Sequence, residues 1–428
     1  MKIETKKLPR GQVELTIELT VEEYQPFLQQ AVSDVSQSVK IPGFRPGKAN
    51  FAAVKQHVGE NEIWQQALEP AVRKTFIKAI EQEKIMSIGS PEIDVVKLAA
   101  GNPVIYKAIV NIIPAVTLAD YSKIKVDQKK VEIGPDKIDE ALNNLQKMRA
   151  AEILVDREVK TGDKVEINFE TFVDKVPVEN GANEKFPLVI GEKTFIPGFE
   201  DQLIGLKKDQ EKTFQLEFPK NYHQKNLAGK PAEFKIKMLA VYQRDLPELN
   251  DEFAKGLGEF KNLAELKDKI KENIATEENN KEKIRLEEEI IEKIIDQSSF
   301  EDIPDLLINS ETEKMVDELA QNISNQGLKF EDYLNHLKKT RDELLLDFAP
   351  QATRRVKSAL VIREISKKQK ITVTDEEIEN DIKKTIQMYG DQPEIKKQID
   401  TPAYRDYLRN VITSRKTIDY LKDAMLTK

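Results

Sequence analysis

The spacing of apolar residues changes along the chain, and this change sets the main limit on the fold. Apolar and polar residues alternate over 13–19 and again over 104–112, which is the pattern of a half-buried strand. Between these stretches, Thr20 and Glu23 have the spacing of a capping box and predict the start of a helix. Apolar residues at helical spacing predict another helix over about 61–84. The first part of the chain therefore predicts a mixed α and β domain.

The middle of the chain has a different pattern, in which short alternating stretches are separated by Gly and Pro. Alternation over 165–169, 214–218 and 234–242 predicts strands, and a short helix is expected to begin near Gly198. From about 247 onward the apolar residues step by three and four, as in amphipathic helices. We therefore predict an α+β multidomain protein in which a β-sheet domain with a short helix precedes an elongated all-α domain.

The length of 428 residues agrees with about three domains, because a domain has about 150 residues. The predicted segments are an α+β domain at 1–113, a linker with a helix opened by Gly134-Pro135 at 114–150, a β-sheet domain at 151–245 and a helical domain at 246–428. The formal charge of -8 arises from the helical segment, whereas the others are close to neutral. This balance argues against non-specific nucleic-acid binding but permits a local basic contact near the N-terminus.

The composition excludes several kinds of chemistry. The absence of Cys excludes disulfides, thiolate zinc sites, iron–sulfur clusters and a Cys nucleophile, and three scattered His disfavour a His-rich metal site. We expect neither a metal nor a cofactor. The N-terminal charges are not followed by an apolar run, and no stretch approaches the roughly 18 apolar residues of a membrane span. The sequence therefore predicts a soluble, cytoplasmic protein without a membrane partner.

A loop between the two N-terminal helices, Ile41-Pro42-Gly43-Phe44-Arg45-Pro46-Gly47-Lys48, carries two Gly and two Pro, which exclude a helix. It presents Phe44, Arg45 and Lys48 together. An aromatic side chain beside two cations suits a partner that combines apolar pockets with phosphates or carboxylates. From the residues alone, an ordinary turn with a buried Phe and solvated charges is the simpler interpretation.

The same loop resembles the ribosome-docking motif of the bacterial trigger factor family, a Gly-Phe-Arg-x-Gly-Lys loop at the same place in the chain. The resemblance implies that the ribosome-binding residues are Gly43, Phe44, Arg45, Pro46, Gly47 and Lys48. The family continues with a hydrophobic residue and Pro, where this chain has Ala49-Asn50. We expect this departure to alter the exit of the loop and to leave Phe44, Arg45 and Lys48 intact.

The segment around Phe195-Ile196-Pro197-Gly198-Phe199-Glu200 resembles the FKBP-type prolyl isomerase family, in which an aromatic cleft holds a substrate proline. The resemblance implies that the catalytic residues are Phe169, Glu179, Phe186, Phe195, Ile196, Phe199, Tyr222 and Phe234. Without the resemblance, a β-domain core with turns is the simpler interpretation.

Some positions depart from the isomerase pattern. Val178-Glu179 stands where an aromatic residue followed by Asp is common, and Glu170-Thr171 replaces Thr-Gly after Phe169. These changes bear on the rate more than on the fold. Pro177 and Gly181 predict a locally rebuilt loop.

The expected chemistry needs no nucleophile. The barrier to rotating a peptide bond is about 18–20 kcal/mol because resonance keeps the amide planar. An apolar pocket that removes water from the carbonyl favours the twisted amide, in which charge is less separated. The Tyr222 hydroxyl is our candidate donor to the carbonyl oxygen. Catalysis would then be selective binding of the twisted state.

The resemblance to the trigger factor family covers essentially the whole chain, with the domains in the same order. It implies an ATP-independent chaperone that binds nascent and unfolded polypeptides at the ribosome exit, keeps them open for folding or export, and isomerises prolyl bonds. The implied ribosomal partners are a ribosomal protein and rRNA. The sequence leaves open whether the chain forms a homodimer away from the ribosome. The alternative is a prolyl isomerase whose other domains deliver unfolded substrate.

Overall fold

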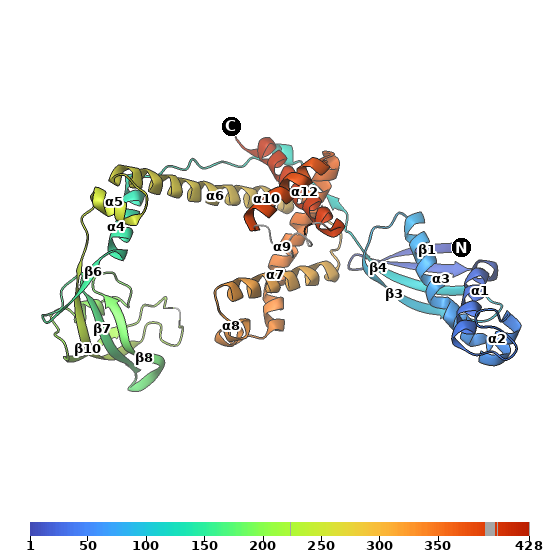
Figure 1. Cartoon of the computed structure of the whole chain (residues 1–428), viewed down its shortest axis with the longest axis horizontal. Helices are drawn as coiled ribbons and strands as arrows, with labels where there is room; N and C mark the ends of the chain where they lie inside the picture. Colours follow the sequence, from blue (N-terminus) through green and yellow to red (C-terminus); the bar gives the residue numbers. More distant parts are fainter. Residues whose placement is uncertain (223, 390–398, 400, 428) are drawn as a thin grey trace. The chain divides into compact units, whose positions relative to one another are not determined.

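The computed structural model describes residues 1–222, 224–389, 399 and 401–427 (Figure 1). The chain forms two compact units, one made of Met1–Gln128 with Lys283–Lys428 and the other of Lys129–Glu282. Within the described residues, no helix combines the length and the apolar character needed to cross a membrane.

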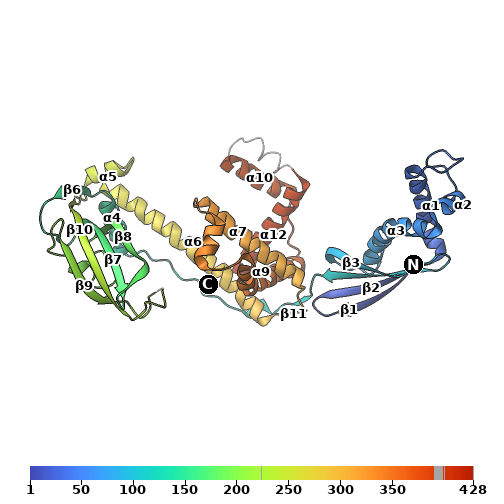
Figure 2. The ribbon, with the colours of Figure 1, turned by 90° about the horizontal axis from the view of Figure 1, so that it is seen from below.

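The N-terminal part of the first unit is an antiparallel sheet with strand order β1-β2-β4-β3, accompanied by helices (Figure 2). Its elements are β1 (Lys2–Leu8), β2 (Gln12–Leu19), α1 (Val21–Ser38), α2 (Phe51–Val58), α3 (Glu60–Gln82), β3 (Ser87–Lys97) and β4 (Val104–Ile112). The strands predicted over 13–19 and 104–112 are confirmed as β2 and β4. The predicted helix start is also confirmed, because Thr20 and Glu23 cap each other reciprocally.

Buried aromatic residues join the two long helices and the sheet of this domain. The Tyr24 ring on α1 stacks on Trp64 of α3 with centroids 5.1 Å apart, and its hydroxyl donates to the Trp64 carbonyl at 2.8 Å. Tyr106 on β4 lies 2.7 Å from the Thr75 hydroxyl of α3, oxygen to oxygen. These contacts fix α1 relative to α3 and so hold the segment that connects α1 to α2.

The C-terminal part of the first unit is helical. Its elements, with the short pieces that join it, are β5 (Val116–Thr117), η1 (Tyr121–Lys123), the second part of α6 (Leu263–Gln297), β11 (Ser299–Phe300), α7 (Asp305–Asn325), α8 (Phe330–Leu337), α9 (Arg341–Lys368), α10 (Asp375–Tyr389) and α12 (Pro402–Met425). Thr374 and Glu377 cap each other reciprocally at the start of α10. A helical C-terminal domain is therefore confirmed.

The structure places the first part of the expected linker 114–150 in this helical domain. Strand β5 pairs with β11. Tyr121, Ile124 and Val126 are buried in one core with residues of α6, α9 and α12. The spacing of these three residues gave no strand or helix pattern, so the sequence offered no sign of a core role.

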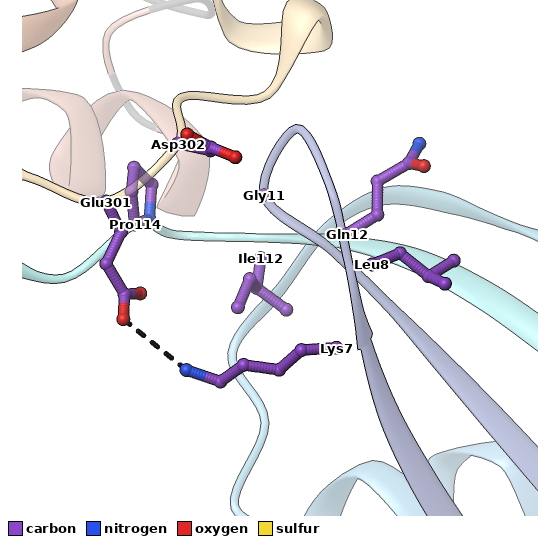
Figure 3. A pocket seen from close by; sticks show the side chains of 8 residues that line it. All are labelled: Lys7, Leu8, Gly11, Gln12, Ile112, Pro114, Glu301 and Asp302. Atoms are coloured by element: carbon purple, nitrogen blue, oxygen red, sulfur yellow. Dashed lines mark hydrogen bonds and ion pairs between the residues drawn. The ribbon is translucent and has the colours of Figure 1, made fainter.

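Fig. 3 shows where the β1–β2 hairpin meets the segment that precedes α7. Lys7 extends toward Glu301, with Nζ and Oε1 3.4 Å apart, and both side chains line a cavity of 320 Å³ (Figure 3). Gly11 has a φ of +65°, and a Cβ there would lie 2.6 Å from the Asp302 carbonyl oxygen. Only Gly therefore fits this close approach.

The second unit contains the predicted β-sheet domain. The sheet order is β6-β10-β7-β8, and β9 also pairs with β10. Its elements are α4 (Pro135–Met148), β6 (Ala151–Val155), β7 (Lys164–Val173), β8 (Val176–Val189), η2 (Glu200–Gln202), β9 (Glu211–Glu217), β10 (Pro231–Asp245), α5 (Asp251–Leu257) and the first part of α6. The predicted helix start at Gly134-Pro135 is confirmed, with Pro in the first turn of α4.

Two predictions for this domain need correction. The helix expected near Gly198 is only the single 3-10 turn η2. The loop predicted from Pro177 and Gly181 lies within strand β8 instead, but the pairing with β7 is interrupted there. Phe172 pairs with Pro177 and Glu170 with Ala182, so residues 178–181 stand opposite Thr171 alone. Asp174 and Lys175 make the turn before this strand with φ values of +52° and +68°, the backbone of a tight hairpin. Register shifts between β7 and β8 absorb the irregular residues as bulges.

Candidate functional site

The loop between α1 and α2 begins with a tight turn over Ile41-Pro42-Gly43-Phe44. The Phe44 N–H donates to the Ile41 carbonyl at 3.2 Å, and Gly43 has a φ of +85°. Pro at the second position and Gly with positive φ at the third are the requirements of a type II turn. The local sequence alone is sufficient to produce this conformation.

A second turn of the same kind follows over Arg45-Pro46-Gly47-Lys48. The Lys48 N–H donates to the Arg45 carbonyl at 3.0 Å, and Gly47 has a φ of +76°. The Gly47 N–H also donates to the Ser36 carbonyl at 3.0 Å, which ties this turn to the end of α1. The two turns thus give a defined backbone to the segment 43–48, which we call the docking loop.

The docking loop presents its aromatic and cationic side chains to solvent. Phe44 is 42% exposed, and Arg45 and Lys48 are exposed as well. No Asp or Glu occurs between Asp34 and Glu60. A cavity of 410 Å³ beside the loop is lined by Ile41, Pro42, Phe44, Ala53, Gln56 and His57. The surface therefore combines an apolar anchor with positive charge, and the interpretation with a buried Phe44 is wrong.

The residues after the docking loop give it a defined exit. Ala49 is buried, and the Asn50 side chain accepts from the Ala53 N–H at 2.9 Å as the N-cap of α2. An Asn in this role satisfies one of the free N–H groups at the helix start. The departure at Ala49-Asn50 therefore leaves a capped helix directly behind Lys48.

In the β-sheet domain, the predicted phenylalanines come together. Phe195 lies on Phe199 with ring centroids 4.0 Å apart, and Phe199 lies 5.3 Å from Phe234. Phe169 lies 5.4 Å from Phe195 and 5.5 Å from Phe186, both edge to face. Such geometries are the favoured ones for aromatic pairs. We call these rings, with the three neighbours described next, the aromatic cluster.

The aromatic cluster includes residues that the site prediction missed. The ring centroid of Phe214 lies 5.4 Å from that of Phe199, and the centroid of Phe218 lies 6.0 Å from that of Phe234. Tyr222 joins the cluster through Phe218, at 4.7 Å between centroids. The alternation of Phe214, Leu216 and Phe218 was visible in the sequence, and it places both rings on one face of β9 and its extension.

Burial divides the cluster into a floor and a rim. Phe199, Phe218 and Phe234 are buried, as is the predicted Ile196, which packs in the same core. The rim consists of the half-buried side chains of Phe169, Phe186, Phe195, Phe214 and Tyr222. The rim offers apolar contact area to a ligand, whereas the floor supports it.

One further candidate falls outside what can be described. Glu179 belongs to β8, but its side chain lies outside the described residues. Across the part of the chain that is described, no group of three or more His, Cys, Asp or Glu could hold a metal ion.

The same domain contains a shielded ion pair at the start of β7. Asp163 Oδ2 and Oδ1 accept from Arg157 at 2.6 and 2.9 Å, and the Lys160 N–H donates to Oδ2 at 2.9 Å. Burial works to raise the pKa of Asp163, but the guanidinium and this N–H outweigh it, so the pKa lies below its ordinary value. The pair therefore fixes the chain before β7 and stays ionised at neutral pH.

Comparison with known proteins decides the family. Residues 1–145 match the family described as "Bacterial trigger factor protein (TF)", and residues 262–423 match its C-terminus. Residues 155–239 match the FKBP-type peptidyl-prolyl cis-trans isomerases. The trigger factor of Carboxydothermus hydrogenoformans is 38% identical over 422 residues, which cover 98% of each chain. The chain belongs to the bacterial trigger factor family.

Other relatives agree. The trigger factor of Caldicellulosiruptor saccharolyticus is 34% identical over 98% of this chain and 96% of its own. The fold is similar to a solved structure described as "Promiscuous Substrate Recognition in Folding and Assembly Activities of the Trigger Factor Chaperone", with a TM-score of 0.52, 23% identity and 99% of each chain covered. As a member of this family, the protein is a ribosome-associated chaperone with peptidyl-prolyl cis-trans isomerase activity.

Proposed function

We propose that the docking loop is the ribosome contact of this chaperone, and that it binds rRNA as well as ribosomal protein. Phe44 enters an apolar site, and Arg45 and Lys48 pair with phosphates or carboxylates. The observation that carries this proposal is the pair of Pro-Gly turns, which present all three side chains on a segment without acidic residues. In this proposal 1–113 is the docking domain, 151–245 the isomerase domain and 246–428 the chaperone domain.

Co-sedimentation with ribosomes tests the docking loop. Changing Phe44, Arg45 and Lys48 together to Ala should abolish binding. The exposed Lys97→Ala on the same domain is the matched control and should bind normally. Wild-type binding by the triple variant would overturn the proposal.

The salt dependence of binding separates rRNA from ribosomal protein as the partner of the cations. If Lys48 contacts a phosphate, Lys48→Ala should reduce the slope of log affinity against log salt by about 1. An unchanged slope with weaker binding would assign Lys48 to a contact with protein.

We propose that the rim of the aromatic cluster holds the substrate proline. Phe169, Phe186 and Phe195 would remove water from the prolyl amide, and the Tyr222 hydroxyl would donate to its carbonyl oxygen. The mutual approach of these rings, two from the strands β7 and β8 and one from the loop after β8, supports this assignment. Phe195→Ala and Tyr222→Phe should each lower kcat/KM in an isomerisation assay on a proline peptide, and rates equal to wild type would reject the pocket.

We further propose that unfolded clients bind a groove in the helical domain. The groove has a volume of 620 Å³ and lies among α6, α9 and α12. Ile291, Ile295, Ile362 and Ile418 give it an apolar lining, and acidic and basic side chains surround them. Ile295→Ser should weaken the suppression of aggregation of an unfolded protein. Ile284→Ser, an exposed position on α6 outside this lining, is the matched control.

The remaining proposals concern location and assembly. The absence of Cys is consistent with a reducing compartment, so we propose that the chaperone works in the cytoplasm. The sequence leaves both a monomer and a homodimer open away from the ribosome. Sedimentation velocity over a range of concentrations distinguishes them, and a concentration-independent monomer would exclude the homodimer.

A further inference from the structure

The loop before Phe195 is held by one buried carboxylate. Glu200 is 7% exposed, and its Oε2 accepts from the Gly191 N–H at 2.7 Å and from the Lys193 N–H at 3.0 Å. Its Oε1 accepts from the Thr194 N–H at 2.8 Å. Hydrogen bonds to an ionised group are roughly twice as strong as neutral ones. Glu200 therefore tethers residues 191–194 through three backbone N–H groups.

The backbone of this loop has a conformation that needs such a tether. Gly191 has a φ of +99° and Lys193 a φ of +54°. A residue other than Gly pays about 1–2 kcal/mol in the left-handed region. Backbone N–H groups turned toward one side by such residues form a site for an anion. Here the anion is supplied by the chain itself, and without it the N–H groups would lose their partner.

The tether acts on the aromatic cluster because the loop runs directly into Phe195 and Ile196. Phe195 contacts Phe199, the residue before Glu200, so the carboxylate fixes both ends of the same short segment. We propose that Glu200 is a positioning residue of the isomerase reaction, which sets the place of Phe195 without contacting the proline. This inference rests on the proposed role of the cluster.

The first test compares variants of Glu200 in the full chain. Glu200→Ala should lower kcat/KM for a proline peptide by about 10- to 100-fold, since a displacement of about 1 Å has effects of this size. Glu200→Gln should lose less, because its amide oxygen can still accept from Gly191 and Lys193. Asp201→Asn removes the neighbouring exposed charge and should match wild type. Wild-type activity in Glu200→Ala would overturn the inference.

A double-mutant cycle separates positioning from a general loss of stability. If Glu200 acts through Phe195, Glu200→Ala should have little further effect on kcat/KM in a Phe195→Ala background. Effects that multiply would show that the carboxylate acts only through the stability of the domain and would overturn the inference. If Phe195→Ala alone has wild-type activity, the proposed pocket fails instead. Hydrogen exchange over residues 155–239 checks that each variant is folded.

Discussion

The tetrapeptide Ile-Pro-Gly-Phe occurs twice, at 41–44 in the docking domain and at 196–199 in the isomerase domain. Both copies fold into the same turn. The Gly φ is +85° in the first and +84° in the second, and the Phe N–H donates to the Ile carbonyl at 3.2 and 3.1 Å. Yet Phe44 is 42% exposed, whereas Phe199 is fully buried.

The difference separates what neighbouring residues determine from what distant residues determine. Pro and Gly set the turn in both places, because each fixes its own backbone dihedrals. The burial of the Phe is decided by distant residues. Phe199 meets Phe214 and Phe234 from two other strands, whereas Phe44 is followed at once by a second turn that ends in the cation Lys48. One turn therefore leaves its Phe at the surface, where we propose that it meets a partner, and the other places its Phe in a core.

The largest difference between the two copies should appear when each Phe is truncated. Phe199→Ala should destabilise the isomerase domain by about 3–5 kcal/mol, the usual cost of emptying a buried aromatic site. Phe44→Ala should leave the stability of the docking domain nearly unchanged while weakening ribosome binding. Hydrogen exchange during urea titration measures both domains in one sample. Equal stability losses would contradict the assignment of Phe44 to a display.

The comparison also shows which features of the fold can be predicted from the sequence. The capping pairs, the Pro-Gly turns and the alternating strands were predictable because their causes lie within a few residues. The assignment of Pro177 and Gly181 to β8 was not, since both residues argued for a loop, whereas β8 pairs with β7 on both sides of residues 178–181. The core role of 116–126 depends on helices far along the chain.

The candidate site divides in the same way. The docking loop could be predicted as one segment, whereas the aromatic cluster needed the family resemblance to unite its members. Neither pattern nor resemblance indicated the tether at Glu200, because its partners are backbone N–H groups, which carry no sequence signal.

Alkaline pH should lower the stability of the docking domain, which contains the exposed turn at 41–44. Burial raises the pKa of Tyr106 to about 12, while its hydrogen bond with Thr75 acts in the opposite direction. The folded domain keeps this proton where an unfolded chain, with a tyrosine pKa of about 10, releases it. This stabilisation is full below about pH 10 and is lost as the pH rises through 12, about 3 kcal/mol in total.

The fluorescence of Trp64, the single Trp of the chain, follows this transition in the docking domain. Tyr106→Phe should shift the alkaline midpoint to higher pH. Tyr24, whose pKa burial also raises, should keep part of the transition. An unshifted midpoint in Tyr106→Phe would show that other groups cause the alkaline loss.

Replacing the glycine of each turn tests the backbone they share. Gly43→Ala and Gly198→Ala should each cost about 1–2 kcal/mol in their turn, since both require a left-handed residue. At Gly43 a Cβ meets no atom within 4 Å, whereas at Gly198 it lies 3.3 Å from a Leu216 methyl, so the second change should cost more. The first should appear as weaker ribosome binding and the second as lower stability. Gly256→Ala, which has open space and no positive φ, is the control.

The smallest loss of stability is expected when the proline of each turn is replaced. This change tests the contribution of the turn itself, apart from the surroundings of its Phe. Pro42 and Pro197 are both exposed, so Pro→Ala removes little packing and acts mainly by freeing the unfolded chain. Each change should therefore cost the same amount, about 0.4–1 kcal/mol, in urea unfolding of its own domain. Agreement would show that the turn contributes equally whether its Phe is displayed or buried. A much larger loss at Pro197 would show instead that the aromatic cluster depends on the turn for more than its backbone angles.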